Sequence, residues 1–341
     1  MKRSIPGSFA LAMCLMLAFA GYAVAAVKGT VTYEFAINAD KGAKDIKLWT
    51  PCPLSEGSQD IKDVKITGNY SKSEIVKDEA TGASYVFAQW GSAQETPKLT
   101  MTFHVDSHFA KGKELKDGGG AYPEDVKKYL KASAFIPSDN RKIVTIAEDA
   151  VEGAKTELEK ARKVYEWTIA NTFRDPDVKG CGLGKALVTL NEAKGGGKCA
   201  DISSVFVTVL RAAGIPARDV FGLRSSGKDG AITGDFHCWA EFYLPGTGWV
   251  QADPADVRKA MLVEKFDLDS PKAKESTEFF WNGDDLFRII MSRADRGLTF
   301  KPAQQGEALD YFMYPFAQVD GKSLDYRDPK SFVYTVTFKA D

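Results

Sequence analysis

The sequence predicts an α+β protein in two parts, because two kinds of pattern follow one another along the chain. Residues 27–110 alternate apolar and polar side chains at period two, which is typical of antiparallel strands. After a polar stretch, helical patterns come first and strand patterns follow them, which is the order of an α+β domain. We therefore expect an N-terminal antiparallel β-sandwich followed by an α+β domain.

The composition is that of a folded globular protein. The chain has 341 residues, of which 44% are hydrophobic, and 45 Lys and Arg stand against 46 Asp and Glu. These values exclude a disordered, collagen-like or disulfide-dense chain. A nucleic-acid-binding protein would need a basic excess to neutralise phosphates, so this near-neutral balance argues against one.

The N-terminus has the three parts of a secretory signal peptide. Lys2 and Arg3 supply the positive charge, residues 9–20 form a short apolar core, and small residues at 23–26 give a cleavage site. The apolar core is too short to anchor the chain permanently in a bilayer. We expect residues 1–26 to be removed, no permanent membrane span, and a periplasmic or secreted protein.

The predicted N-terminal β domain, residues 27–110, carries no chemical constellation. Val31, Tyr33 and Phe35 show its period-two alternation. His104 and His108 lie four residues apart, but between a strand and a linker exposed polar residues are expected, so we assign no metal there. From the architecture alone, this domain is a candidate to bind substrate or a cell-envelope partner.

Residues 111–123 are polar, contain three consecutive glycines and predict a linker. Residues 124–341 then form the second domain, which we expect to include the C-terminal strands. Its predicted helices cover residues 124–130, 156–172 and 201–213, and its predicted strands cover residues 217–223, 237–244, 248–252, 286–291, 311–319 and 332–338.

Cys199 is the candidate nucleophile of the second domain. It follows three glycines, interrupted only by Lys198, and precedes an apolar helix. Unpaired N–H groups at a helix N-terminus stabilise a thiolate and lower its pKa. The same N–H groups can help to bind the oxyanion of a tetrahedral intermediate.

His237 and Asp253 are the candidate partners of that thiol. His237 begins a predicted strand, and Asp253 ends the next strand across a short turn, so antiparallel pairing would bring them together. A carboxylate there would fix the imidazole tautomer; Asp256 is a weaker candidate for this role. Strand alternation predicts that Cys238 points away from the face of His237 and has a structural role.

Four segments together resemble the transglutaminase-like superfamily. They are residues 197–201 around Cys199, the helix end at 210–218, residues 237–241 and residues 248–254. The resemblance covers roughly residues 124–299. It implies a transglutaminase-like, papain-like core in which Cys199 is the nucleophile, His237 the base and Asp253 its orienting carboxylate.

The resemblance also implies the reaction. Family members begin with attack of the thiolate on an amide carbonyl, which gives a thioester; water then makes a hydrolase and an amine makes a cross-linking enzyme. We expect a cysteine protease or amidase acting on peptides or proteins rather than a transglutaminase-type acyltransferase, with no cofactor and no metal. Asn171 and Trp167 are open candidates for the oxyanion site.

Other classes of function stay open. A metal site made of Cys181, Cys199, Cys238 and His237 is disfavoured because it lacks a C-x-x-C pair. A redox protein using Cys181 and Cys238 matches no thioredoxin-like spacing. A catalytically silent binding or scaffold protein of the cell envelope is the main alternative. The sequence does not decide the disulfide pairing of Cys52, Cys181 and Cys238.

Overall fold

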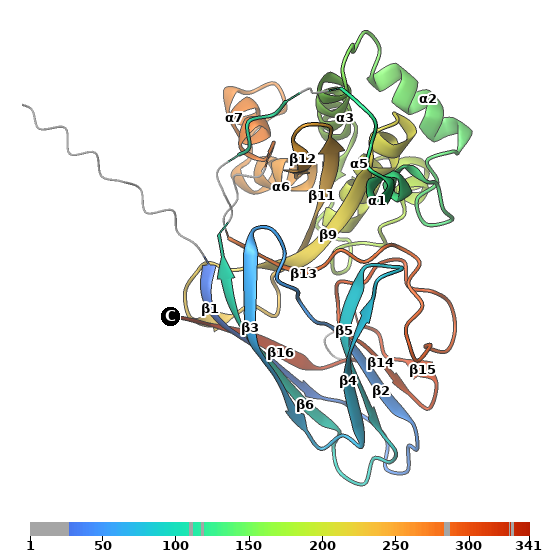
Figure 1. The fold of residues 1–341 in the computed structure, drawn as a ribbon, viewed down its shortest axis with the longest axis vertical. Coiled ribbons are helices and arrows are strands. Elements are labelled where there is room, and N and C mark those ends of the chain that lie inside the picture. The colour runs from blue at the N-terminus through green and yellow to red at the C-terminus, as the bar shows by residue number, and fades with distance from the viewer. Residues whose placement is uncertain (1–26, 109–111, 117–118, 283–286, 327, 329–330) are drawn as a thin grey trace, which may run out of the picture.

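The computed structural model describes residues 27–341 apart from 109–111, 117–118, 283–286, 327 and 329–330 (Figure 1). The predicted signal peptide, residues 1–26, lies outside the described residues. Within the described part of the chain, no helix has the length and apolar character needed to cross a membrane.

Two five-stranded antiparallel sheets form the lower half of the molecule in Figure 1. The first has the strand order β10 (Gly230–Ala231), β16 (Tyr334–Ala340), β1 (Val27–Ala36), β6 (Lys98–Ser107) and β3 (Gln59–Gly68). The second has the order β15 (Lys322–Ser323), β14 (Phe316–Val319), β2 (Ile46–Pro51), β5 (Ala83–Trp90) and β4 (Lys72–Asp78).

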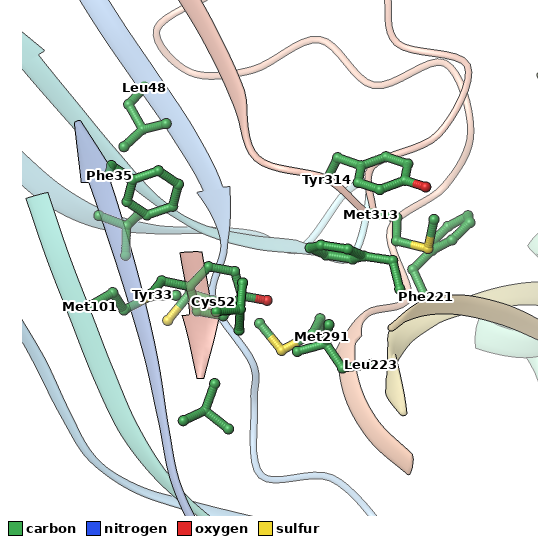
Figure 2. Close-up of a cluster of buried hydrophobic side chains, with 14 of the residues drawn as sticks. Tyr33, Phe35, Leu48, Cys52, Met101, Phe221, Leu223, Met291, Met313 and Tyr314 are labelled. Atoms are coloured by element: carbon green, nitrogen blue, oxygen red, sulfur yellow. The ribbon is translucent and has the colours of Figure 1, made fainter. Parts of the chain in front are cut away.

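The two sheets pack face to face, as the period-two pattern predicts. Buried side chains of β1, β2 and β6, among them Phe35, Leu48 and Met101, share one hydrophobic cluster (Figure 2). The second sheet is also covered on its outer face, where Trp49 stacks on Phe300 with ring centroids 5.2 Å apart. This second cover explains why nearly every side chain of β5 is buried.

The C-terminal strands complete the sandwich, and this corrects the predicted assignment of all residues after 124 to the second domain. Val336 in β16 pairs with Tyr33 in β1. Phe316 in β14 pairs with Trp49 in β2. A strand's alternation shows which of its side chains are buried but not which strand it pairs with, so the sequence pattern could not reveal this return of the chain.

The upper half in Figure 1 holds a four-stranded antiparallel sheet and the helices. The strand order is β12 (Gly248–Ala252), β11 (Phe236–Leu244), β9 (Ala217–Arg224) and β13 (Arg288–Ser292). The helices are α1 (Glu124–Lys127), the 3-10 turn η1 (Lys128–Leu130), α2 (Arg141–Ala150), α3 (Glu157–Asn171), α4 (Ala186–Asn191), α5 (Cys199–Ala212), α6 (Pro254–Glu264) and α7 (Pro271–Phe279). A two-stranded parallel pair, β7 (Phe173–Arg174) with β8 (Gly196–Gly197), precedes α5.

Helix α5 is the central element of this half. All but the last of its residues are buried, and it contacts β9, β11 and helices α2, α3, α4 and α6. The helix is buried on every side because each of its faces meets another element. The structure starts it at Cys199, two residues before the predicted start, which makes Cys199 its first helical residue.

A shared hydrophobic cluster joins the two halves. Phe221 and Leu223 of β9 and Met291 of β13 belong to the same cluster as Tyr33 of β1 (Figure 2). The chain between Ser107 and Glu124 forms no helix or strand in its described residues, in agreement with a linker. The position of α5 over the four-stranded sheet then brings the candidate residues together.

Candidate active site

Cys199 lies at the N-terminus of a 14-residue helix whose first turn is held by a buried carboxylate. Asp201 accepts a hydrogen bond from the backbone N–H of Lys198 at 3.0 Å. It also accepts from the N–H groups of Leu183 and Gly184, each at 2.9 Å. Asp201 therefore fixes both the start of α5 and the preceding loop that carries Cys181.

This loop lies so close to the helix that it requires glycine. Gly182 has φ +99°, and a Cβ there would overlap the Asp201 carboxylate. Its carbonyl accepts a hydrogen bond from the Tyr311 hydroxyl at 2.8 Å. Arg296 donates to the carbonyl of Gly184 at 2.6 Å. The C-terminal part of the chain thus helps to hold the loop beside Cys199.

The structure brings His237 and Asp253 together as the strand pairing predicts. His237 is fully buried, and its Nε2 donates to Asp253 Oδ2 at 2.6 Å. Asp253 follows β12 and is the N-cap of α6, where its Oδ1 accepts from the N–H of Asp256 at 2.9 Å. The helix cap and the short β11–β12 connection together fix the carboxylate against the imidazole.

Two arginines and a second carboxylate complete a buried ion cluster. Arg288 lies 2.8 Å from Asp253, and Arg224 forms an ion pair with Asp256. Asp256 Oδ2 lies 3.4 Å from His237 Nε2, so the weaker candidate is also next to the imidazole. No sequence pattern pointed to Arg224 and Arg288, because only strand pairing places β9 and β13 beside this end of β11.

The oxygens of Asp253 and Asp256 and a ring nitrogen of His237 lie within 4.8 Å of one another, close enough to hold a cation. However, the guanidinium groups of Arg224 and Arg288 already face these carboxylates. We therefore interpret the group as a hydrogen-bonded ion cluster that orients the imidazole.

The electrostatics favour a thiolate–imidazolium pair. Burial opposes ionisation of Cys199, but interactions with the thiols of Cys181 and Cys238 and with His237 bring its pKa well below the ordinary thiol value. Burial opposes protonation of His237, but the negative charges of Asp256 and Asp253 raise its pKa above the ordinary value. Within the described chain His237 Nδ1 has no hydrogen-bond partner, which leaves this nitrogen for the thiol.

Cys238 contradicts one prediction. We expected it to point away from the site, yet its thiol interacts with that of Cys199. Its carbonyl accepts from Ser203 of α5 at 3.5 Å, so this part of β11 faces the helix that begins with Cys199. Alternation assigns His237 and Cys238 to opposite faces of the strand. Both nevertheless interact with the Cys199 thiol at the start of α5.

All four cysteines among the described residues are free and buried. Cys181, Cys199 and Cys238 belong to one part of the core, and the backbone N–H of Ala200 donates to the carbonyl of Cys181 at 2.9 Å. The pairing that the sequence left open is therefore not a disulfide in this structure. Instead, the thiols of Cys181 and Cys238 both interact with the thiol of Cys199, the candidate nucleophile.

The structure ties neither candidate oxyanion residue to Cys199. Asn171 is exposed, and its side-chain amide donates to the carbonyl of Trp167 at 2.8 Å. His104, which the sequence left without a role, hydrogen-bonds Asp341 at 3.1 Å. The backbone N–H of Ala200 is bonded to the carbonyl of Cys181, so for the oxyanion we expect other N–H groups at the start of α5 as donors.

Residues 144–254 match the family model of the transglutaminase-like superfamily, and this range contains Cys199, His237 and Asp253. The chain belongs to the transglutaminase-like superfamily. An uncharacterized protein of Haemophilus influenzae is 31% identical over 342 residues, which cover 91% of this chain and 90% of that protein. The uncharacterized protein YebA of Bacillus subtilis is 41% identical over 68 residues, 17% of this chain and 9% of its own.

A solved structure resembles this chain over both of its halves. The crystal structure of a protein from Cytophaga hutchinsonii, proposed to be a cysteine protease, has a TM-score of 0.52 at 16% identity. The match covers 92% of this chain and 98% of that one. The predicted fold class, a transglutaminase-like core with an antiparallel β-sandwich, is thereby confirmed.

The lowered pKa of Cys199 predicts an unusual pH dependence of its alkylation. An ordinary thiol with pKa about 8.5 becomes roughly 75-fold more reactive between pH 6 and pH 8 as it ionises. Cys199 should change less over this range, because its lowered pKa gives it a larger thiolate fraction at the lower pH. Iodoacetamide labelling followed by peptide mass spectrometry measures this. In His237→Ala the profile should become steeper, because one of the interactions that lower the pKa of Cys199 is lost.

Cys52 is the matched internal control for this measurement. It is buried like Cys199, but burial raises its pKa to about 11, so it should be unreactive at pH 6. Equal labelling of both cysteines at pH 6, or a Cys199 profile that His237→Ala leaves unchanged, would contradict the thiolate–imidazolium pair.

Proposed function

We propose that this protein is a thiol-dependent enzyme that acts on amide bonds of peptides or proteins through Cys199, His237 and Asp253. The observation that carries the proposal is the placement of His237. Its Nε2 is taken by Asp253 at 2.6 Å, its Nδ1 is left for a thiol, and that thiol begins a buried helix. This is the arrangement that activates a nucleophile and keeps its base in one tautomer.

The reaction follows from these positions. The Cys199 thiolate attacks the amide carbonyl, and N–H groups at the start of α5 stabilise the oxyanion. His237 then gives its Nδ1 proton to the leaving nitrogen, and a thioester remains on Cys199. The now neutral imidazole takes a proton from the second nucleophile, which attacks the thioester and restores the thiol.

We propose water rather than an amine as that second nucleophile. Two partly exposed guanidinium groups interact electrostatically with the thiols of the site. Arg224 interacts with Cys199, and Arg174 interacts with Cys181. Since Arg224 is paired with Asp256, it is the charge of Arg174 that a lysine ammonium approaching the thioester would meet, whereas water would not. The similar structure from Cytophaga hutchinsonii is described as that of a proposed cysteine protease, which agrees with hydrolysis. The similarity itself shows only the fold.

We also propose that the mature chain acts in the periplasm or outside the cell, on the strength of the signal-peptide pattern in residues 1–26. A cavity of about 580 Å³ lies where the sandwich meets the second half of the chain. Its lining includes Ser58 of the sandwich and Arg218, Glu241 and Trp249 of the four-stranded sheet. This supports the expectation that the β domain takes part in binding substrate or an envelope partner.

The test is an assay that separates the two outcomes. The protein is incubated with casein and a fluorescent primary amine, and both new peptide N-termini and incorporated amine are measured. We expect cleavage without incorporation, abolished in Cys199→Ala and retained in Cys52→Ala. Incorporation exceeding cleavage would contradict hydrolysis. No product of either kind, together with an unreactive Cys199, would favour the silent scaffold.

A further inference from the structure

Two cysteine thiols surround the candidate nucleophile, and the proposed reaction uses neither of them. Cys181 lies in the loop before α4, and Cys238 lies in β11 next to His237. Both interact with the Cys199 thiol, and all three are free. Three interacting free thiols are unusual in a protein expected to be exported, because an oxidising compartment permits disulfides.

Cys181 is the better placed of the two to bond with Cys199. The hydrogen bond from Ala200 to the carbonyl of Cys181 holds the two main chains side by side, which a disulfide requires. The bonds from Leu183 and Gly184 to Asp201 also hold the loop that carries Cys181 beside the start of α5. Its side of the site is also the more open, since Cys181 is 7% exposed and Cys238 is fully buried.

Cys238 is held by the sheet instead. It lies in the β11–β9 ladder opposite Phe221, and β11 is an interior strand with β12 on its other side. Moving its sulfur into bonding distance would shift a strand that is hydrogen-bonded on both sides. We therefore expect Cys238 to stay a thiol.

We propose that Cys199 and Cys181 form a reversible redox pair, in which a hydroperoxide oxidises Cys199 and Cys181 traps the product as a disulfide that switches the enzyme off. The proposal rests on the proposed function of Cys199 as a reactive thiolate. The disulfide is a regulatory modification of that site. Hydrogen peroxide is the smallest of the hydroperoxides that would form it.

The chemistry balances without any further reactant. The Cys199 thiolate attacks one oxygen of hydrogen peroxide, the O–O bond breaks, and the leaving hydroxide takes a proton from His237 to become water. Cys199 is then a sulfenic acid. The Cys181 sulfur attacks the Cys199 sulfur, the S–O bond breaks, and the hydroxide leaves as water with the proton of Cys181. Two thiols lose two electrons in total, and one peroxide becomes two waters.

The trap protects the nucleophile. Without a resolving thiol, a sulfenic acid reacts with more peroxide to sulfinic and sulfonic acids, which ordinary thiol reductants do not reverse. With Cys181 beside it, the sulfenic acid is consumed within the same molecule. Reduction of the disulfide then returns both thiols.

The sequence makes the pairing easy to read by mass spectrometry. Trypsin places Cys181, Cys199 and Cys238 on three different peptides, which cover residues 180–185, 199–211 and 229–258. The full-length chain is treated with hydrogen peroxide, blocked with N-ethylmaleimide and digested without reductant. We expect residues 180–185 linked to residues 199–211, and Cys199 alkylation that peroxide removes and dithiothreitol restores.

Three variants make the experiment decisive. In Cys181→Ser, peroxide should drive Cys199 to forms carrying two or three added oxygens, and dithiothreitol should not restore its alkylation. Cys52→Ser should behave as the wild type does, and Cys238→Ser should still form the link between residues 180–185 and residues 199–211. A link from residues 199–211 to residues 229–258 would overturn the assignment of Cys181. Equal irreversible oxidation of Cys199 in the wild type and in Cys181→Ser would overturn the redox pair.

The two proposals fail separately. Linkage needs only the thiols and the oxidant, so a chain that forms the disulfide but cleaves no amide contradicts the proposed enzyme activity. A chain that cleaves amides but never forms the linkage contradicts the redox pair alone.

Discussion

Asp253→Asn is expected to lower kcat for amide cleavage about 10⁴-fold while leaving the fold intact. An asparagine keeps the shape of the side chain, and its oxygen can still cap α6 by accepting the N–H of Asp256. Its amide nitrogen, however, would face His237 Nε2 and Arg288, which are both donors. Nε2 would then have to accept from this amide, so the neutral imidazole would carry its proton on Nδ1 and could no longer take the proton of the Cys199 thiol there.

Asp256→Asn is the matched comparison for this variant. Asp256 lies 3.4 Å from His237 Nε2, against 2.6 Å for Asp253, so its loss should weaken the imidazolium without changing the tautomer. We expect roughly a tenfold loss of kcat, the order of magnitude that follows if the imidazolium loses about one pKa unit of stabilisation. Cleavage assays on both variants, with circular dichroism as a check of folding, measure this. A larger loss in Asp256→Asn would make Asp256 the orienting carboxylate.

Arg296→Met is expected to lower the free energy of unfolding by about 3–5 kcal/mol. Arg296 and Asp219 are both buried and form a two-point ion pair, with both distances 2.7 Å. Removing the arginine leaves a buried carboxylate without its counter-charge and the carbonyl of Gly184 without its donor. Urea unfolding at pH 7 measures the loss. The loop that carries Cys181 should also become more susceptible to proteolysis.

Two comparisons isolate the cause. The double variant Asp219→Asn with Arg296→Met removes both charges, so it should regain much of the stability lost in the single variant. Lys272→Met breaks an ion pair with Glu264 in which both side chains are about half exposed, and should cost less than about 1 kcal/mol. If Arg296→Met costs no more than Lys272→Met, the buried pair does not hold this part of the fold.

Local chemistry explains the helices that the sequence predicted well. The sequence predicts a helix over residues 156–172, and Thr156 is the cap of α3, which it holds by accepting the N–H of Glu159 at 3.2 Å. The start of α5 was placed two residues late. The carboxylate that caps this helix belongs to Asp201, a residue of its first turn, and accepts the N–H of Lys198. The same carboxylate accepts the N–H of Leu183, which lies outside the helix.

The pairing of His237 with Asp253 could also be predicted, because it depends on a short connection. Strands joined by a tight turn pair with each other, and the chemistry of the two side chains then suggests their contact. Arg224 and Arg288 could not be predicted in the same way. They reach the cluster from β9 and β13, through strand pairings across long stretches of chain.

By itself, the sequence determined the α+β class, the alternating strands of the sandwich, the buried helix behind Cys199 and the meeting of His237 with Asp253. These depend on the period of apolar residues, on caps and on short turns, all of which act between residues close in the chain. Tertiary structure alone decided that β14 and β16 return to the N-terminal sheets, that two arginines face the carboxylates, and that Cys181 and Cys238 meet at Cys199. The physical reason is that a strand's alternation specifies its buried face but not its partner, so contacts across sheets are selected only when the whole core packs.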